Sequence, residues 1–149
     1  MADAVSVPVI AAGAIADRRG TAGAFALGAD GIQVGTAFLR TRQSAANDAH
    51  REAIDRTPAH GTVLTRAMSG RLARGAPNET TRSIEETGEI APFPAQNWLT
   101  GQFRRAAADR GLGEMQSLWL GQAGQCSRFE DAQDLFAELA AGVPGDPVR

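Results

Sequence analysis

Two short apolar segments with a helix-like stretch between them constrain the fold of this chain more than any other feature. Residues 7–12 are apolar at every position, which is typical of a parallel strand buried on both faces. Asp17 and Gly28 then predict the start and the end of a helix over residues 18–27. A second strand is expected at residues 31–35. This order predicts a βαβ unit and therefore an α/β fold.

The rest of the chain alternates between helical patterns and irregular sequence. Further helices are expected at residues 44–56, 83–87, 98–110 and 130–140, and a third strand at residues 62–65. Ser44 is the expected N-cap of the first of these helices, and Thr57-Pro58 ends it. Residues 69–97 are rich in glycine and proline, so we expect them to be largely irregular.

Composition excludes several classes of protein. The chain has 149 residues and a formal net charge of -2, with no basic patch for a nucleic acid partner. It lacks a run of about 18 apolar residues and a signal-peptide pattern, so we expect no membrane association. Its one cysteine, Cys126, and the absence of zinc-ligand spacings predict no internal disulfide, no metal site and a cytoplasmic location.

Both predicted strands of the βαβ unit end at residues with very small side chains. Gly13-Ala14 follows the first strand, and Gly35-Thr36 ends the second. Ligands of parallel sheets bind at the carboxyl ends of strands, and phosphate approaches backbone N–H groups only where side chains are small. These two strand ends predict either a binding site for a phosphate group, which we call a phosphate cup, or turns in which glycine only allows the chain to pass from a strand into a helix. Neither GxGxxG nor GxxxxGK[ST] is present to decide between them.

Five segments occur in a fixed order along the chain: VPVIAAGAIAD, ALGADGIQVGTAF, TVLTRAMSGRLARG, APFPAQNWLT and SLWLGQAG. This ordered set resembles the C-terminal half of nitronate monooxygenases, FMN-dependent (β/α)8-barrel enzymes formerly called 2-nitropropane dioxygenases. The resemblance implies a partial TIM barrel made of the last two or three βα units, followed by a C-terminal helical lid region. We accordingly expect barrel units in residues 1–66 and the irregular segment and lid helices in residues 67–149.

The resemblance also implies a reaction. Nitronate monooxygenases oxidise alkyl nitronates with O₂ to a carbonyl compound and nitrite. FMN-dependent enoyl-acyl carrier protein reductases have similar glycines at their strand ends, so that oxidoreductase activity is the alternative. A third hypothesis is a non-catalytic, truncated half-barrel.

The positions that the resemblance assigns to the FMN phosphate are Gly13, Ala14, Gln33, Val34, Gly35 and Thr36. Ala14 stands where the family usually has a second glycine, which costs on the order of 1 kcal/mol if that position needs a positive φ. Ala37 stands where the family tends to have arginine. Ser69 is expected either near the substrate or in a structural role, and Gln122 either near the flavin or in lid packing.

No residue of this chain is expected to be the catalytic base. The resemblance places the catalytic histidine in the earlier half of the barrel, and a whole barrel needs about 200 residues or more. His50 is expected on a solvated helix face and His60 in a surface loop. The apolar strand at residues 7–12 would have bare edges without preceding strands. We therefore expect a truncated gene product, an internal start or half of a split enzyme, which pairs with a separate N-terminal half or with a second copy.

Overall fold

The protein has an α/β fold that divides into two compact units. The computed structural model describes residues 2–145. The first unit combines Met1–Ala45 with Gln122–Arg149, and the second unit is Ala46–Gly121. The expected boundary after residue 66 therefore falls inside the second unit, and the last helix belongs with the N-terminal strands.

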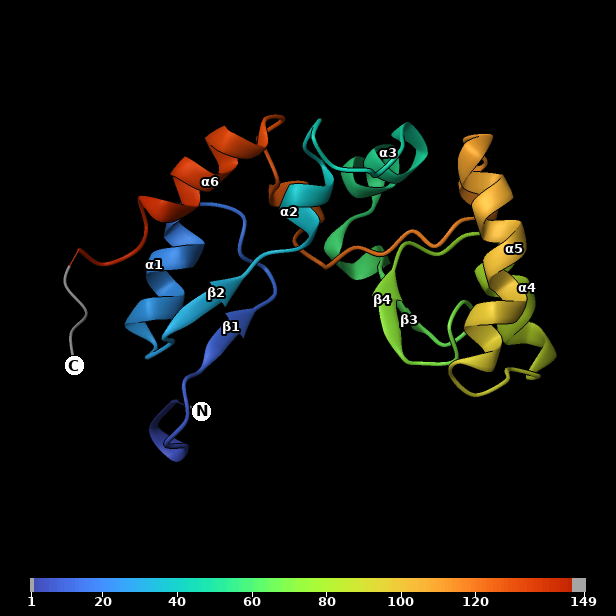
Figure 1. Cartoon of the computed structure of the whole chain (residues 1–149), viewed down its shortest axis with the longest axis horizontal. Coiled ribbons are helices and arrows are strands. Elements are labelled where there is room, and N and C mark those ends of the chain that lie inside the picture. Colours follow the sequence, from blue (N-terminus) through green and yellow to red (C-terminus); the bar gives the residue numbers. More distant parts are fainter. Residues whose placement is uncertain (1, 146–149) are drawn as a thin grey trace. The chain divides into compact units, whose positions relative to one another are not determined.

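The first unit contains the βαβ arrangement expected from the sequence. Strands β1 (Ile10–Ala12) and β2 (Gly31–Gln33) pair in parallel, and helix α1 (Arg18–Ala26) connects them (Figure 1). The carboxylate of Asp17 accepts hydrogen bonds from the backbone N–H groups of Arg19 and Gly20, which caps the helix. Gly28 follows the helix with a φ of +88°, a conformation that favours glycine. The predicted start and end of this helix are confirmed.

The first strand is shorter and more exposed than its sequence predicts. It begins at Ile10 and not at Val7, and these two side chains are 56% and 65% exposed. In the described part of the chain, β1 pairs only with β2. The prediction of burial on both faces is therefore wrong, because the side chains at both ends of β1, Ile10 and Ala12, are exposed.

The core of the first unit joins the two ends of the sequence. Helices α2 (Thr36–Leu39) and α6 (Ala132–Ala140) supply its buried side chains together with the segment before α1. The buried members of this cluster are Ala16, Ala37, Leu135 and Leu139. Two hydrogen bonds from the Arg18 guanidinium to Glu138, at 2.9 and 2.6 Å, fasten α1 to α6. The N-terminal strand pair therefore depends on residues near the C-terminus for its packing.

The second unit is built around an antiparallel strand pair. Strand β3 (Val63–Thr65) pairs with β4 (Ala73–Gly75), and Val63 lies opposite Gly75. Its helices are α3 (Asp48–Arg56), α4 (Glu79–Thr87) and α5 (Ala95–Asp109) (Figure 1). Single 3₁₀ turns are η1 (Ala2–Ala4) and η4 (Gly124–Cys126) in the first unit, and η2 (Ala59–Gly61) and η3 (Gly113–Met115) in the second.

Several predictions for the second unit are wrong. Helix α5, expected from residue 98, begins at Ala95. Helix α3 begins after Asn47 and not at Ser44, because the Asn47 side chain accepts the hydrogen bond from the backbone N–H of His50. Helix α4 begins at Glu79 and not at residue 83, because Asn78 caps it. Strand β4 lies inside the segment expected to be irregular, where its pairing with β3 compensates for a weak strand pattern.

Candidate functional site

The carboxyl ends of β1 and β2 form one corner of the first unit. Ala12 lies opposite Gln33 in the parallel register, so both strands end at the same edge of the pair (Figure 1). Gly13 and Ala14 follow β1, and Val34 and Gly35 lead from β2 into α2. The structure thus brings together the six positions predicted for phosphate binding: Gly13, Ala14, Gln33, Val34, Gly35 and Thr36. We call this set the strand-end corner.

Open space surrounds the two glycines of the strand-end corner. A Cβ atom added to Gly13 or to Gly35 would meet nothing within 4 Å. Gly13 has a φ of +103°, so its backbone alone disfavours any other residue. Gly35 has a φ of -108°, which every residue can adopt. The backbone conformation of Gly35 therefore does not require glycine, and what the missing side chain provides is free space at the corner. The open space at both glycines is suited to binding a phosphate group.

Ala14 and Asp17 lie on the side of the corner from which the chain enters α1. Ala14 has a φ of +58°, and among the described residues other than glycine only Ala14 has a positive φ. The strain expected for alanine at this position is thus present. Asp17 already accepts from the first N–H groups of α1, and the N–H of Gly20 and the Arg19 guanidinium hold the pKa of Asp17 below its usual range. The N-terminus of α1 is occupied by a carboxylate, so an anion would have to bind at the glycine-containing turns.

Ala37, where the family tends to have arginine, is part of the hydrophobic core. It is 3% exposed and clusters with Leu135 and Leu139 of α6. Ala37 therefore takes part in the packing of α2 against α6.

The two residues predicted on the substrate side belong to different units. Ser69 lies in the second unit, where its hydroxyl donates to the carbonyl of Arg71 and accepts from the N–H of Arg71. Gly70, next to it, has a φ of +81°, and a Cβ there would meet Ala91 O at 2.6 Å. These contacts favour the structural alternative for Ser69. Gln122 is exposed and lies in the first unit, and its role stays a prediction.

Both histidines lie in the second unit, and neither belongs to the strand-end corner. His60 is exposed in the η2 turn, as expected. His50 is half-buried, and its Nε2 lies 2.8 Å from the carbonyl oxygen of Trp119. The expectation of a solvated His50 is wrong, because α3 turns this face toward the segment that contains Trp119.

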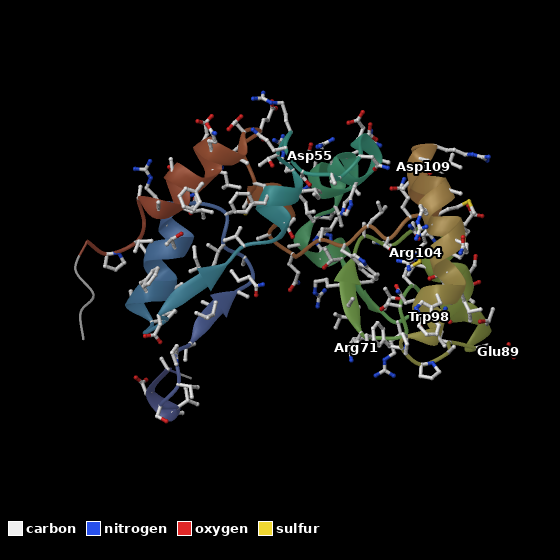
Figure 2. The ribbon with its side chains drawn as sticks, viewed as in Figure 1. Asp55, Arg71, Glu89, Trp98, Arg104 and Asp109 are labelled. Atoms are coloured by element: carbon white, nitrogen blue, oxygen red, sulfur yellow. The ribbon has the colours of Figure 1, made fainter. Side chains whose placement is uncertain are left out.

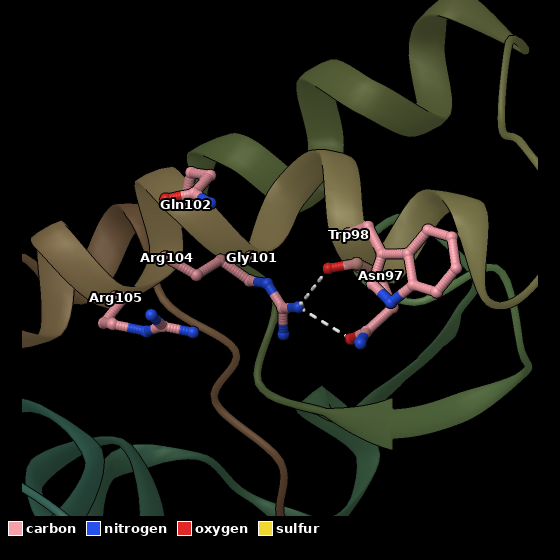
Figure 3. Close-up of a pocket in the computed structure, with 6 residues that line it drawn as sticks. All are labelled: Asn97, Trp98, Gly101, Gln102, Arg104 and Arg105. Atoms are coloured by element: carbon pink, nitrogen blue, oxygen red, sulfur yellow. Dashed lines mark hydrogen bonds between the residues drawn. The ribbon is translucent and has the colours of Figure 1, made fainter.

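A pocket on α5 was not predicted from the sequence. It has a volume of about 450 Å³, and all the residues that line it come from this helix: Asn97, Trp98, Gly101, Gln102, Arg104 and Arg105 (Figure 3). Figure 2 shows Trp98 and Arg104 on the same helix. The spacing of Trp98, Gly101 and Arg104 at intervals of three residues would have revealed a shared helix face.

Within residues 2–145, the acidic, histidine and cysteine side chains form no group of three that could hold a metal ion. No described helix has the length and apolar character needed to cross a membrane.

Comparison with known proteins gives the family. The fold and the strand-end corner define an α/β protein with glycine-containing turns after neighbouring parallel strands. A sequence model of the family described as "Nitronate monooxygenase" matches residues 1–142. The chain belongs to the nitronate monooxygenase family.

Individual relatives agree with this assignment. A curated "probable nitronate monooxygenase" of Staphylococcus aureus (strain JH9) is 43% identical over 141 residues, which are 92% of this chain and 39% of the relative. A nitroalkane oxidase structure from Streptomyces ansochromogenes is 39% identical with a TM-score of 0.84, over 93% of this chain and 40% of that one. A FabK structure from Thermotoga maritima is 31% identical with a TM-score of 0.76, over 93% and 45%. The chain thus spans about two fifths of the length of the curated relatives that it matches.

Proposed function

We propose that this chain forms part of an FMN-dependent enzyme that oxidises alkyl nitronates with O₂ to a carbonyl compound and nitrite. Its own share of the work is to bind the FMN phosphate at the strand-end corner. Membership of the nitronate monooxygenase family supports the reaction, and the geometry of the strand-end corner supports the assignment of its residues to phosphate binding.

The observation that carries this proposal is the open space at two glycines on neighbouring strand ends. Gly13 and Gly35 leave room within 4 Å of where a Cβ would lie, and the parallel register brings their turns to one edge. Backbone N–H groups exposed in this way can donate to phosphate oxygens. Ala14, Gln33, Val34 and Thr36 complete the proposed binding surface, and the Thr36 hydroxyl offers a further polar group.

The protein's role is binding and orientation, because the redox chemistry belongs to the cofactor. Bound FMN would accept electrons from the nitronate and pass them to O₂. The corner would fix the phosphate end of FMN and thereby orient the rest of the molecule. We assign no catalytic base to this chain, since the resemblance places the catalytic histidine in the earlier half of the barrel. The complementary part of a TIM barrel, supplied by a separate N-terminal half or through homo-oligomerisation, would provide the base and the remaining pocket.

Binding of FMN and riboflavin to the full chain tests this assignment. The two flavins differ in the phosphate, so a phosphate cup predicts that FMN binds at least about tenfold more tightly, in line with one or two charge-assisted hydrogen bonds. Quenching of flavin fluorescence measures both affinities. Equal affinity for the two flavins, or no binding of either, would contradict the assignment.

The variant Gly35→Val tests whether the strand-end corner binds the phosphate group. The backbone at Gly35 accepts a side chain, so the substitution places bulk at the corner without the strain that Gly13→Val would add. We expect it to remove the preference for FMN over riboflavin. Gly23→Ala, at another glycine with nothing within 4 Å of its Cβ position, is the matched control and should preserve the preference.

The second flavoenzyme reaction remains the alternative. The likeness to FabK, with a lower identity and TM-score than the nitroalkane oxidase, is the observation that favours it. Nitrite release from propionate-3-nitronate, measured on the assembled enzyme, supports nitronate oxidation. Oxidation of NAD(P)H in the presence of a crotonyl thioester supports the enoyl reductase. If the purified chain retains no flavin and shows neither reaction with any partner, it is a non-catalytic half-barrel.

A further inference from the structure

The pocket on α5 contains a half-buried cation, Arg104, without a matching anion. The Arg104 guanidinium donates through Nη1 to Ser117 Oγ at 2.7 Å and through Nη2 to the Asn97 carbonyl and side-chain oxygens at 3.1 and 2.7 Å (Figure 3). All three acceptors are neutral. Within residues 2–145, Arg104 and Arg105 form no salt bridge, so the pocket carries two uncompensated positive charges.

The environment of Arg104 makes that charge costly. Burial lowers the pKa of the Arg104 guanidinium, and its Nε is buried with no hydrogen-bond partner. A guanidinium has five N–H donors, and the three bonds above leave two unused. A desolvated cation of this kind gains more from an anion than an exposed arginine does, because there is less water to screen the pair.

Gly101 keeps the centre of the pocket open. It lies in the interior of a 15-residue helix, where glycine is destabilising by roughly 0.5–1 kcal/mol relative to alanine. Its Cβ position would have one neighbour within 4 Å, the Nη2 of Arg104 at 3.9 Å. Alanine would fit there sterically, so packing does not explain the glycine. The glycine leaves open space beside Arg104.

Trp98 supplies a flat apolar surface in the same pocket as Arg104. Its side chain is 71% exposed although it is one of the largest apolar groups in the chain, and it lines the same pocket (Figure 3). An exposed indole next to a guanidinium is suited to stacking on a planar ring whose charged substituent meets the arginine.

We propose that the α5 pocket binds a small oxyanion attached to a planar ring, with the ring against Trp98 and the carboxylate or phosphate against Arg104 and Arg105. Gly101 provides the room between them. The residues of this site all belong to α5 in the second unit, and none of them is a member of the strand-end corner, so the proposal is argued without the proposed flavin function.

Titration of the full chain with benzoate tests this proposal by isothermal calorimetry. Saturable one-to-one binding of benzoate is expected, whereas benzyl alcohol, which lacks the charge, and inorganic phosphate, which lacks the ring, should bind at least about tenfold more weakly. Phenyl phosphate is the second probe: tighter binding than benzoate assigns the site to phosphates, and weaker binding assigns it to carboxylates. No saturable binding of either aromatic anion overturns the proposal.

Two variants localise the binding. Arg104→Met should weaken benzoate binding at least about tenfold, and Arg110→Met, at the end of the same helix and outside the pocket, should leave it within twofold. Because Arg104 also holds Asn97 and Ser117, Gly101→Leu is the second variant: it blocks the pocket and raises the helix propensity. Gly23→Leu is its matched control in α1. Benzoate binding that survives Gly101→Leu, or that is lost equally in a control, overturns the assignment to this pocket.

Discussion

Ala14 is held in a conformation that glycine adopts at lower cost. Its φ of +58° is in the left-handed region, where a Cβ costs about 1–2 kcal/mol. Ala14→Gly removes this strain but adds backbone freedom to the unfolded chain, so we expect the free energy of unfolding to rise by about 0.5–1 kcal/mol. Urea unfolding followed by circular dichroism measures the change. Ala12→Gly, in strand β1, is the control and should lower stability; an equal loss in both variants would contradict the strain.

Asp17 makes the stability of the first unit depend on pH. Hydrogen bonds from the Gly20 N–H and from Arg19 hold its pKa below the usual value of about 3.9 in the folded state. A depressed pKa contributes stability that is present above pH 4 and is lost as the pH falls through the folded value. In Asp17→Asn the cap remains but does not titrate. We expect the variant to lose less thermal stability than the wild type between pH 5 and 2.

The comparison for this prediction is the slope of melting temperature against pH. Asp17→Ser, which also caps without titrating, should show the same reduced slope as Asp17→Asn. A slope equal to that of the wild type in both variants would mean that other groups control acid unfolding.

Asn78 fixes helix α4 to the η3 turn. It is 1% exposed; its Oδ1 accepts from the N–H and hydroxyl of Thr81, and its Nδ2 donates to the carbonyls of Gly113 and Gln116. Asn78→Ala removes the cap and leaves two buried carbonyls unpaired, so we expect a loss of about 2–4 kcal/mol in unfolding free energy. Glu79→Ala, at the exposed neighbouring position, should change it by less than about 0.5 kcal/mol. Denaturant unfolding followed by tryptophan emission measures both, and similar effects would contradict the role of Asn78.

Elements with strong local signals are the ones that sequence predicts well. Helix α1 follows from a capping aspartate and a terminating glycine, and the strand-end corner follows from small residues after two apolar runs. Strand β4 has no such signal, because Ala73, Arg74 and Gly75 are not typical strand residues. Its pairing with β3 and the bridge from Gly75 to Trp119 are tertiary. Helix α3 shows a different limit: Ser44 was the predicted cap, but Asn47, three residues later, makes the capping hydrogen bond with the backbone N–H of His50.

The α5 pocket is a candidate binding site that the sequence did not predict, for a similar reason. Arg104 and Trp98 are ordinary helix residues when read one at a time. The pocket depends on burial of the guanidinium and on the space at Gly101, and both depend on how the helix packs.

At the scale of the whole molecule, the strand-end corner depends on a helix near the far end of the sequence. Leu135 of α6 is 1% exposed and packs in the cluster that contains Ala16 and Ala37. We expect Leu135→Ala to lower the unfolding free energy by about 2–5 kcal/mol and to weaken FMN binding, although Leu135 is not in the corner. Phe136→Ala, at the adjacent position that is 66% exposed, is the control. Circular dichroism and flavin quenching measure both effects, and equal flavin affinity in the two variants would contradict the coupling.

The division of the first unit between both ends of the chain also affects how the protein is made. Residues 1–45 leave the ribosome before α6 exists, and residues 46–121 must be translated in between. At typical elongation rates this delay lasts about 4–15 s, which is long compared with hydrophobic collapse. During that time Ala16 and Ala37 are without Leu135 and Leu139 of α6, against which they pack. A nascent chain of this topology is therefore expected to be a client of ribosome-associated chaperones until α6 is made.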